Sequence, residues 1–565
     1  MTGQAPVRGA RSLLTVAALA VMLAAADTYV VVLALPDMMA GAGLGIESLQ
    51  RGTPIISGFL LGYIAVLPLI GRLADLVPRR KILIACLLIF VLGSAVTALA
   101  VDLNVLVGGR FLQGIGGGGL VPATLAMVAD LWPPGQRGTP LGVVGGVQEL
   151  GAVLGPLLGA AVLLVSDWRG IFWLNVALGL LFVALLLALG QGATAIITER
   201  PQPRNIPRTA LAWVIGLIAA GLWLLALTAP EALVTSVAYG EPFIPFGETS
   251  TSRVWTPVGL AATIALLAWA GVTVPKWWPV LRQVDLWGAA LIAIALGSLV
   301  LTFSSAEPET EVLGPLGWWL LPVGALAVVA FAIRQKTAKS PLIPSGVVRA
   351  RVWPALLVSL LVGAAIVAIV VDVPLLARLD GESTQTEAAL VLVRFLVAVP
   401  IGAVLGGVLL RWLAPGVVAA AGLAATTVGL TVMAGWDRAS LGADWETTWV
   451  LGLAGLGVGM AIAPVNDAAL ADSRPDAHGT VSSLVVVARM VGMVVGLAAL
   501  TAYGLRQFYE AVALLPDPTD TVALLDAGVV QVQSVFAGAA LAAGLAAVLA
   551  LGLGLKRADK STPSA

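Results

Sequence analysis

The segment GVQELGAVLGPLLGA, residues 146–160, places one carboxylate, Glu149, in a run that otherwise holds only Gln148 and apolar or glycine residues. An ionised side chain in the middle of a bilayer costs about 2.5–3.5 kcal/mol on insertion scales. A carboxylate in such a run therefore needs a partner or a function, provided that the run crosses a membrane.

The composition of the whole chain indicates that this run crosses a membrane. Of the 565 residues, 59% are hydrophobic and 11% are charged, whereas soluble proteins are roughly 45–50% apolar and about 25% charged. We therefore expect an all-α integral membrane protein. A net charge of zero gives no indication of nucleic acid, and the lone cysteine, Cys86, excludes an intrachain disulfide. No cofactor or metal is expected, and the lone histidine, His478, is interpreted as a solvated loop residue.

Sixteen apolar stretches approach the length of about 20 residues that a membrane helix needs. They cover 12–35, 52–75, 82–101, 106–130, 139–165, 171–190, 209–229, 255–275, 284–304, 316–334, 351–377, 387–408, 415–436, 448–471, 480–506 and 531–555. The first is too long for a signal peptide and is interpreted as a retained helix. Fourteen spans remain the alternative, because losing a pair of spans preserves the topology.

Basic residues orient these spans. With the N-terminus in the cytoplasm, 22 of the 31 lysines and arginines fall on the cytoplasmic side. Six fall outside, and Arg110, Arg394 and Arg489 fall within spans. This distribution follows the positive-inside rule. It predicts a multi-pass protein of the inner (plasma) membrane with both termini in the cytoplasm.

The spans divide into two groups of six separated by four. We expect an N-terminal bundle over 1–190, a linker with about four membrane helices over 191–345, a C-terminal bundle over 346–556 and a tail over 557–565. The loops GRLADLVPRRK (71–81) and GGVLLRWLAPG (406–416) occupy matching positions in the two bundles. They indicate an internal repeat, and many transporters place their substrate path between such repeats.

The chain lacks a GxxxxGK[ST] nucleotide-binding motif, and the glycine run QGIGGGGLVP (113–122) lies in an apolar span, where it favours helix packing. Motifs of intramembrane or serine hydrolases are also missing, so an enzyme is not expected. Energy for transport then comes from an ion gradient or from a partner.

Four charges fall near mid-membrane, and they divide by bundle. Asp27 and Glu149 lie in the N-terminal spans, and Arg394 and Arg489 in the C-terminal spans. An acid and an arginine that pair in one conformation and part in another switch the proton affinity of the acid, because burial raises a carboxyl pKa and a nearby arginine lowers it. We predict these four as proton-coupling residues. Static buried salt bridges are the alternative.

Several motifs resemble those of the major facilitator superfamily. They are GRLADLVPRRK with Gly71, Asp75, Arg79 and Arg80, VGGRFLQGIGGG (107–118) with Arg110, GAVLGPLLGA (151–160) with Gly151, Gly155, Pro156 and Gly159, and DWRGIFWLNV (167–176). Pro78 and Ala160 depart from the usual glycines of these motifs. GAVLGPLLGA resembles the fifth-helix motif typical of antiporters, and DWRGIFWLNV resembles the start of the sixth helix in drug:proton antiporters with fourteen spans. The resemblance implies two six-helix bundles, alternating access and export.

The resemblance also implies roles for charged and glycine residues. An inner gate would contain Asp75, Arg79, Arg80, Asp130 and Arg137, for which positive-inside anchoring by the arginines is the alternative. Arg110 would assist proton transfer, with snorkelling of its side chain to the outer face as the alternative. The glycine motif of residues 151–159 would be a hinge that suppresses leak, or simply a tight helix contact.

A closer resemblance links AADTYVVV (25–32), FLLGYIAVLPLIGRLAD (59–75) and LVPATLAMVADLW (120–132) to actinobacterial exporters associated with the lipoprotein LprG. It implies triacylglyceride-like lipid or drugs as cargo and a periplasmic lipid-carrying lipoprotein as partner. Spans 209–229 and 255–275 have no counterpart in that family. The stretch 507–530 is expected to be a long solvated loop, with a periplasmic projection that meets a partner as the alternative. Asp372 belongs either to an outer gate or to the membrane interface.

These observations predict a proton-coupled exporter of lipid or hydrophobic drugs. A general multidrug antiporter without a lipid role and a non-transporting membrane scaffold or receptor are the alternatives.

Overall fold

The computed structural model describes residues 9–42, 49–193, 206–228, 254–304, 317–379, 385–442, 444–517 and 520–555. Within these ranges every regular element is a helix, as predicted. Helices satisfy their backbone hydrogen bonds internally, which lipid demands. Fifteen helices are long and apolar enough to cross a membrane, and a sixteenth, α10, carries the shorter apolar segment Leu286–Thr302. The sixteen predicted spans thus correspond to sixteen helices, one for one.

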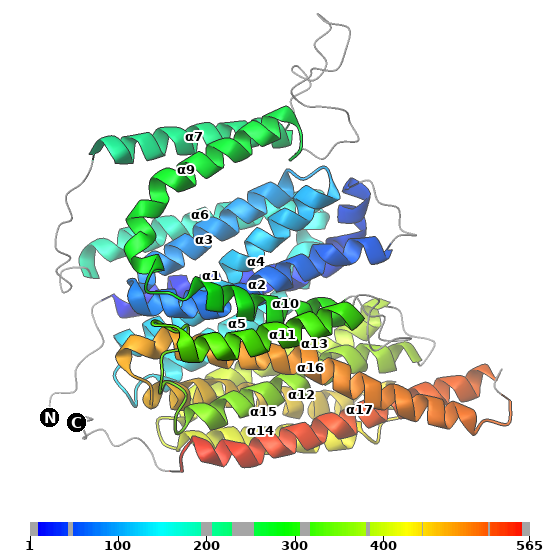
Figure 1. Cartoon of the computed structure of the whole chain (residues 1–565). Helices are drawn as coiled ribbons and strands as arrows, with labels where there is room; N and C mark the ends of the chain where they lie inside the picture. The colour runs from blue at the N-terminus through cyan, green and yellow to red at the C-terminus, as the bar shows by residue number, and fades with distance from the viewer. Residues whose placement is uncertain are drawn as a thin grey trace, which may run out of the picture.

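The first six helices pack mainly with one another. They are α1 (Ala10–Gly41), α2 (Leu49–Leu76), α3 (Arg79–Ala98), α4 (Leu103–Leu131), α5 (Gly138–Leu163) and α6 (Trp168–Ala193). The last six form a second bundle: α12 (Val352–Leu379), α13 (Gln385–Leu409), α14 (Pro415–Met433), α15 (Asp444–Ala471), α16 (His478–Ala513) and α17 (Thr521–Ala550). Figure 1 shows that α1 begins and α17 ends at the same end of the molecule, here called the terminal face.

The two bundles repeat one packing pattern. In each, the first helix packs on the fifth, the second on the fourth, the third on the fourth, and the third on the sixth. Thus α1 packs on α5 as α12 packs on α16, and α3 packs on α6 as α14 packs on α17. The matching loops of the sequence therefore belong to structurally matching helices, which supports the predicted internal repeat.

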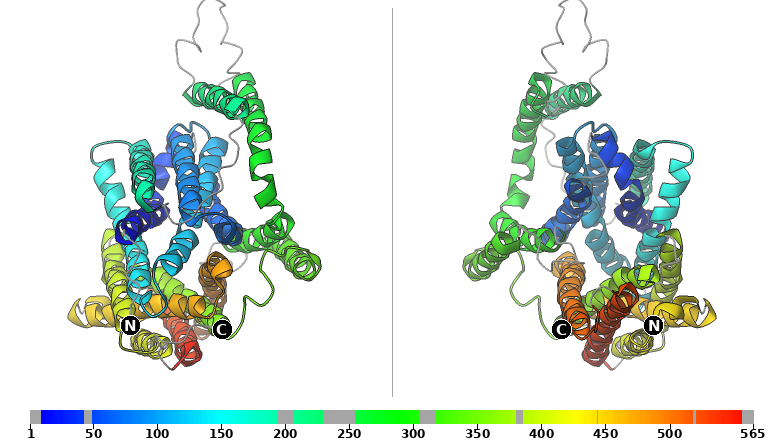
Figure 2. Two further views of the ribbon diagram at one scale, coloured as in Figure 1. Left: turned by 90° about the vertical axis from the view of Figure 1, so that its left-hand side faces the viewer. Right: turned by 90° about the vertical axis from the view of Figure 1, so that its right-hand side faces the viewer.

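Four helices join the bundles in sequence. They are α7 (Ile206–Thr228), α9 (Pro257–Leu281), α10 (Leu286–Ser304) and α11 (Gly317–Thr337). α7 pairs with α9 along the outside of the N-terminal bundle, and α10 pairs with α11 (Figure 2). α10 also packs on α2 of the first bundle and on α16 of the second. It therefore covers one side of the junction between the bundles.

The expectation of a long solvated loop over 507–530 is wrong. α16 continues to Ala513 and α17 starts at Thr521, where Asp520 caps its first turn by accepting from the amides of Val522 and Ala523. At 1.5 Å per residue the 36 residues of α16 span about 54 Å, well beyond the roughly 30 Å hydrocarbon core of a bilayer. Figure 1 shows both helices projecting past the others, away from the terminal face.

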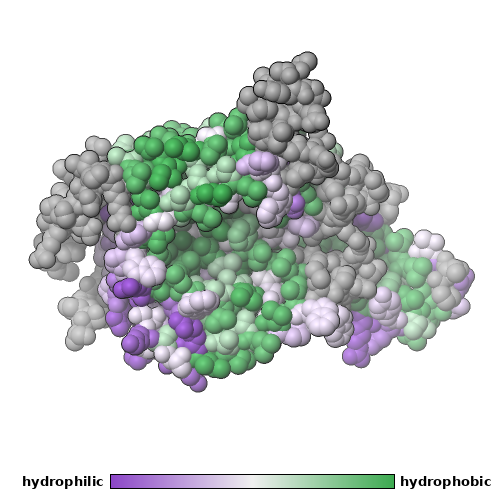
Figure 3. All heavy atoms as spheres, turned by 45° about the horizontal axis from the view of Figure 1, so that its top comes forward, coloured by the Kyte–Doolittle hydropathy of each residue, from purple (hydrophilic) through white to green (hydrophobic). Residues whose placement is uncertain are grey.

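The surface fits a membrane setting. Large apolar side chains are exposed on the outward helices, such as Leu217 of α7 at 69% and Leu267 of α9 at 66%. Figure 3 shows apolar residues across the middle of one face and hydrophilic residues toward its two ends. A band of this kind matches the apolar interior of a bilayer between two polar interfaces.

Candidate functional site

The two bundles meet along a seam that is closed at the terminal face. There α5 packs on α13 and α15, while α2 and α4 pack on α16. Glycines bring the backbones together: a Cβ on Gly142 of α5 would lie 2.6 Å from the carbonyl oxygen of Ala403 on α13. Sequence analysis did not single out Gly142, which forms a separate four-residue series with Gly138 and Gly146 at the start of α5.

Glu149 and Arg489 form an ion pair across this seam. Nη1 of Arg489, on α16, lies 3.2 Å from Oε1 of Glu149, on α5. Their side chains are 12% and 21% exposed, respectively. The predicted pairing of an N-terminal acid with a C-terminal arginine is therefore confirmed for these two residues, while its role in coupling stays a prediction.

The pair borders a largely apolar cavity between the bundles. α1 contributes Tyr29, α2 contributes Phe59 and Tyr63, and α16 contributes Met490 and Met493. The cavity volume is about 110 Å³, below the roughly 300–1,000 Å³ of sites that enclose a drug-sized ligand. The aromatic and methionine residues were not predicted, because apolar side chains in an apolar span carry no signal of a cavity.

Asp27 does not pair across the seam, so the expectation of a C-terminal counter-charge for it is wrong. Its Oδ2 lies 2.5 Å from Nη1 of Arg110, within the same bundle. Its Oδ1 accepts from Gln113 at 3.3 Å and from Asn175 at 2.5 Å. Because Asp27 is only 1% exposed, these nearby donors balance its charge without any group from the second bundle.

Arg110 is held at the centre of this cluster. Its side chain is 1% exposed, so snorkelling to the outer face does not occur. The guanidinium also donates to Oε1 of Gln113 at 2.9 Å and lies 4.5 Å from the centre of the Phe59 ring, a cation–π contact. Phe59 also borders the cavity, so the cluster and the cavity share a wall.

Asp75 connects the bundles at the terminal face. Its carboxylate accepts from the amides of Gly479 at 2.7 Å and Thr480 at 2.9 Å, and from the Thr480 hydroxyl at 2.6 Å. These groups open α16, so a carboxylate of the first bundle caps a helix of the second. Gly71, one turn before Asp75 on α2, packs against Ser483 and Gly479 of α16.

Asp130, at the end of α4, extends this contact. It pairs with Nε of Arg79 at 3.2 Å and lies 3.4 Å from Nδ1 of His478. Arg79 also reaches Asp75 at 3.4 Å. His478 is 4% exposed, so its interpretation as a solvated loop residue is wrong. Its place as the first residue of α16 puts it between the bundles, a fact that only the fold could supply.

Two predicted gate arginines bind within their own bundle in this conformation. Arg80 donates to the carbonyls of Leu186 and Leu187 on α6, at 2.8 and 2.9 Å. Arg137 donates to the carbonyl oxygens of Ala129 and Trp132. Burial lowers the pKa of Arg137, and Asp467 and Asp130 counter that effect. The hydrogen bonds of both arginines fix helix ends within the first bundle, while the charge of Asp467, on α15, acts on Arg137 from the second bundle.

The glycine motif of α5 packs against α1. A Cβ on Gly155 would lie 2.5 Å from the carbonyl oxygen of Ala26, and Gly151 and Gly159 make similar approaches to Met22 and Val30. α5 runs without a break through Pro156. A tight helix contact therefore describes this motif here, and its role as a hinge stays a prediction.

The remaining predicted residues lie in the second bundle. Asp372 of α12 is 3% exposed, so the alternative that it sits at an exposed interface is wrong; its Oδ2 has no hydrogen-bond partner among the described residues. Arg394 lies half-buried on α13. Within the described ranges no three His, Cys, Asp or Glu side chains are grouped so as to hold a metal ion.

Comparisons with known proteins agree with this architecture. The chain is 34% identical over 538 residues to a triacylglyceride transporter of Mycobacteroides abscessus, covering 92% of this chain and 88% of the relative. It is 35% identical over 523 residues to a triacylglyceride transporter of Mycobacterium tuberculosis, covering 89% and 85%.

Two solved structures share the fold at low sequence identity. The human organic anion transporter MFSD10 (TETRAN) superposes with a TM-score of 0.55 at 15% identity, covering 96% of this chain and 99% of the other. The proton:xylose symporter XylE superposes with a TM-score of 0.51 at 14% identity, covering 93% and 94%. Residues 17–334 match the sequence model of the family described as Major Facilitator Superfamily. With more than half of its length matched, and with two six-helix bundles meeting at a central seam, the chain belongs to the major facilitator superfamily.

Proposed function

We propose that this protein is a proton-coupled secondary transporter that exports a triacylglyceride-like lipid by alternating access. The observation that carries the proposal is the Glu149–Arg489 pair, which spans the seam and borders an apolar cavity. The relatives named triacylglyceride transporters support the class of cargo. Transport of this kind needs no catalytic step, so we propose a transporter and not an enzyme.

The proposal places the protein in the inner (plasma) membrane with the terminal face in the cytoplasm. The excess of lysine and arginine on that side supports this orientation. Residues 1–190 and 346–556 would move as two units around the cavity, and residues 191–345 would connect them. The seam is closed at the terminal face, so this conformation faces outward or is occluded.

Protonation of Glu149 provides the coupling. When the bundles part, an ionised Glu149 would lose its counter-charge while it still borders a largely apolar cavity, which disfavours the charged form. A proton on the carboxylate removes that charge. A conformation in which Arg489 approaches expels the proton, because a nearby cation favours the ionised carboxylate. Proton uptake on one side and release on the other would then accompany each cycle.

The cavity is too small for a triacylglyceride in this conformation. Cargo therefore enters after the bundles part, from the membrane and between helices. The extended α16 and α17 project from the opposite face, where a periplasmic lipid-carrying lipoprotein would meet the exporter. Their charged ends, with Arg506 paired to Glu510, offer that partner a polar surface.

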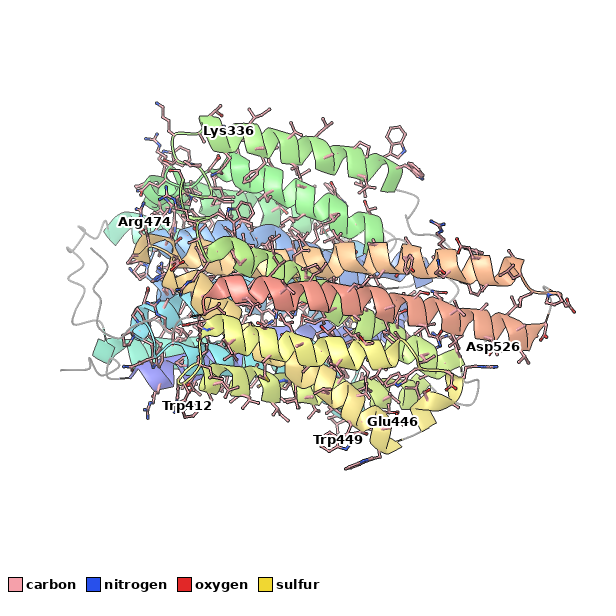
Figure 4. All side chains as sticks on the ribbon, turned by 90° about the horizontal axis from the view of Figure 1, so that it is seen from below. Lys336, Trp412, Glu446, Trp449, Arg474 and Asp526 are labelled. Carbon is pink, nitrogen blue, oxygen red and sulfur yellow. The ribbon has the colours of Figure 1, made fainter. Side chains whose placement is uncertain are left out.

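The test is transport of labelled triacylglyceride from proteoliposomes, with and without an imposed pH gradient. We expect gradient-driven movement in the wild type and its loss in Glu149→Gln. Glu446→Gln is the matched control, because Glu446 is an exposed glutamate at the start of α15 and does not line the cavity. Figure 4 shows it near the edge of the molecule. Equal transport by Glu149→Gln and wild type would contradict the coupling role.

One observation favours a second function, export of lipophilic cations. Tyr29, Phe59 and Tyr63 line the same cavity as Glu149, and aromatic faces beside an acid attract organic cations. The same vesicles loaded with ethidium separate the two functions. Movement of ethidium without movement of lipid would make the protein a multidrug antiporter. Movement of neither substrate would favour the scaffold alternative.

A further inference from the structure

A second and larger hollow lies at the terminal face, between the ends of α1, α5 and α13. Its volume is about 890 Å³, and it opens to the outside. Thr15 belongs to α1, Thr139 to α5 and Arg411 to the turn after α13. The hollow therefore has walls from both bundles, at a place that the coupling site does not reach.

The charge of this groove has one sign. Among the described residues that line it, Arg11 and Arg411 are the only ionisable ones and none is an acid. Nε of Arg411 donates to the hydroxyl of Thr139 at 3.1 Å, across the seam. A guanidinium carries five N–H donors, so Arg411 retains most of its donors for a ligand. Two arginines in one groove whose described lining includes no acid attract an anion, and guanidinium groups match phosphate geometry.

The position of the groove identifies the source of the anion. Trp412, at its mouth, is 64% exposed, and the adjacent Leu413 is 42% exposed. Tryptophan collects at the level of lipid headgroups. Leu14 and Leu410 of the lining are only 7% and 8% exposed, so the deeper part of the groove includes apolar side chains, and Val143 adds a third. A ligand with a phosphate at the mouth and hydrocarbon beyond it fits this order, and a soluble anion would leave the apolar wall uncovered.

We propose that the groove binds an anionic phospholipid from the leaflet next to the terminal face, with its phosphate on Arg11 and Arg411 and its acyl chains along the apolar wall. Arg11 belongs to the first bundle and Arg411 to the second. A bound headgroup therefore joins the bundles where Gly142 meets α13. It stabilises the conformation that is closed at the terminal face, because parting the bundles there separates the two arginines.

Retention of lipid by the purified full-length protein tests the proposal. Native mass spectrometry would compare bound dioleoyl phosphatidylglycerol with dioleoyl phosphatidylcholine. We expect the wild type to retain phosphatidylglycerol preferentially over phosphatidylcholine. In R11Q/R411Q this preference should fall by about tenfold or more, because the variant lacks the charge-assisted hydrogen bonds from both guanidinium groups to the phosphate. The matched control is K336Q/K339Q, which removes two exposed positive charges from the same face. Figure 4 shows Lys336 and Trp412 on opposite sides of that face.

Two further measurements test whether the guanidinium charges themselves bind the ligand, and whether that ligand is a lipid or a soluble anion. Thr139→Val removes the hydrogen bond to Arg411 while leaving both guanidinium groups, so we expect it to retain phosphatidylglycerol within about twofold of wild type. Soluble glycerol phosphate at millimolar concentration should leave lipid retention unchanged. Equal retention by R11Q/R411Q and wild type, or an equal loss in K336Q/K339Q, would overturn the proposal. Displacement by glycerol phosphate would overturn the assignment to a lipid.

Discussion

Two carboxylates of the same bundle, Asp27 and Glu149, are each paired with an arginine but in different settings. Asp27 is 1% exposed and is bound by Arg110, Gln113 and Asn175, all from its own bundle. Glu149 has one arginine partner, which comes from the other bundle and borders a cavity. The comparison separates a cluster that stabilises one bundle from a pair that conformational change can break.

The largest expected effect is on the stability of the Asp27 cluster. Asp27→Ala leaves Arg110 as an uncompensated buried charge and should lower the free energy of unfolding by about 3–5 kcal/mol. Glu149→Gln should change it much less, because that site is partly exposed. Unfolding of the detergent-purified variants, followed by circular dichroism, would measure both. Similar losses in the two variants would remove the distinction between cluster and pair.

The next effect concerns the pair itself. Glu149→Arg and Arg489→Glu each place two like charges at the seam, and each should lose proton-driven transport. The double exchange restores opposite charges, and we expect it to recover part of the transport, with a coupling energy of about 1–3 kcal/mol. Proteoliposome transport by all four proteins gives this value. A double variant no better than either single variant would show that the orientation of the pair also matters, beyond the presence of opposite charges.

A third prediction applies the comparison to the gate. Asp75→Asn weakens hydrogen bonds to the start of α16 that are worth about 1.5–3 kcal/mol when charged, so the seam should open more often at the terminal face. The lone cysteine, Cys86, is buried, so Cys86→Ala is a suitable background for Ser483→Cys. We expect thiol labelling at position 483 to be about tenfold faster in Asp75→Asn. Asp437→Asn, in an exposed turn on the opposite face, is the control and should leave the rate unchanged.

The smallest expected effect separates two glycines of α5. Gly155→Ala crowds Ala26 within the bundle and should cost about 1–3 kcal/mol of stability. Gly142→Ala crowds Ala403 across the seam, where the bundles can move apart. We expect it to speed the same labelling reaction with little loss of stability. A large loss of stability in Gly142→Ala would mean that the seam behaves as part of a rigid core.

Particular residues show how far the sequence could be interpreted. Glu149 and Arg489 stood out because a charge in an apolar span is costly and therefore conspicuous, whereas Asp75 was identified by the resemblance of GRLADLVPRRK to a family motif. The partner of Asp27 was assigned wrongly, because depth along a helix does not tell which neighbour it faces. His478 was misjudged for a related reason: a polar connection in sequence can be a buried helix start in space. Tyr29, Tyr63 and Gly142 gave no signal, since apolar and small residues are common in every span.

The sequence by itself determined the helical membrane fold, its sixteen apolar segments and the two groups of six. These follow from length, hydropathy and the need to satisfy every backbone hydrogen bond inside a bilayer. Only the tertiary structure decided which charges meet, how far α16 and α17 extend past the other helices, and where the bundles close. Those features depend on contacts between helices far apart in the chain, and periodicity along one helix carries no information about the neighbour that it meets.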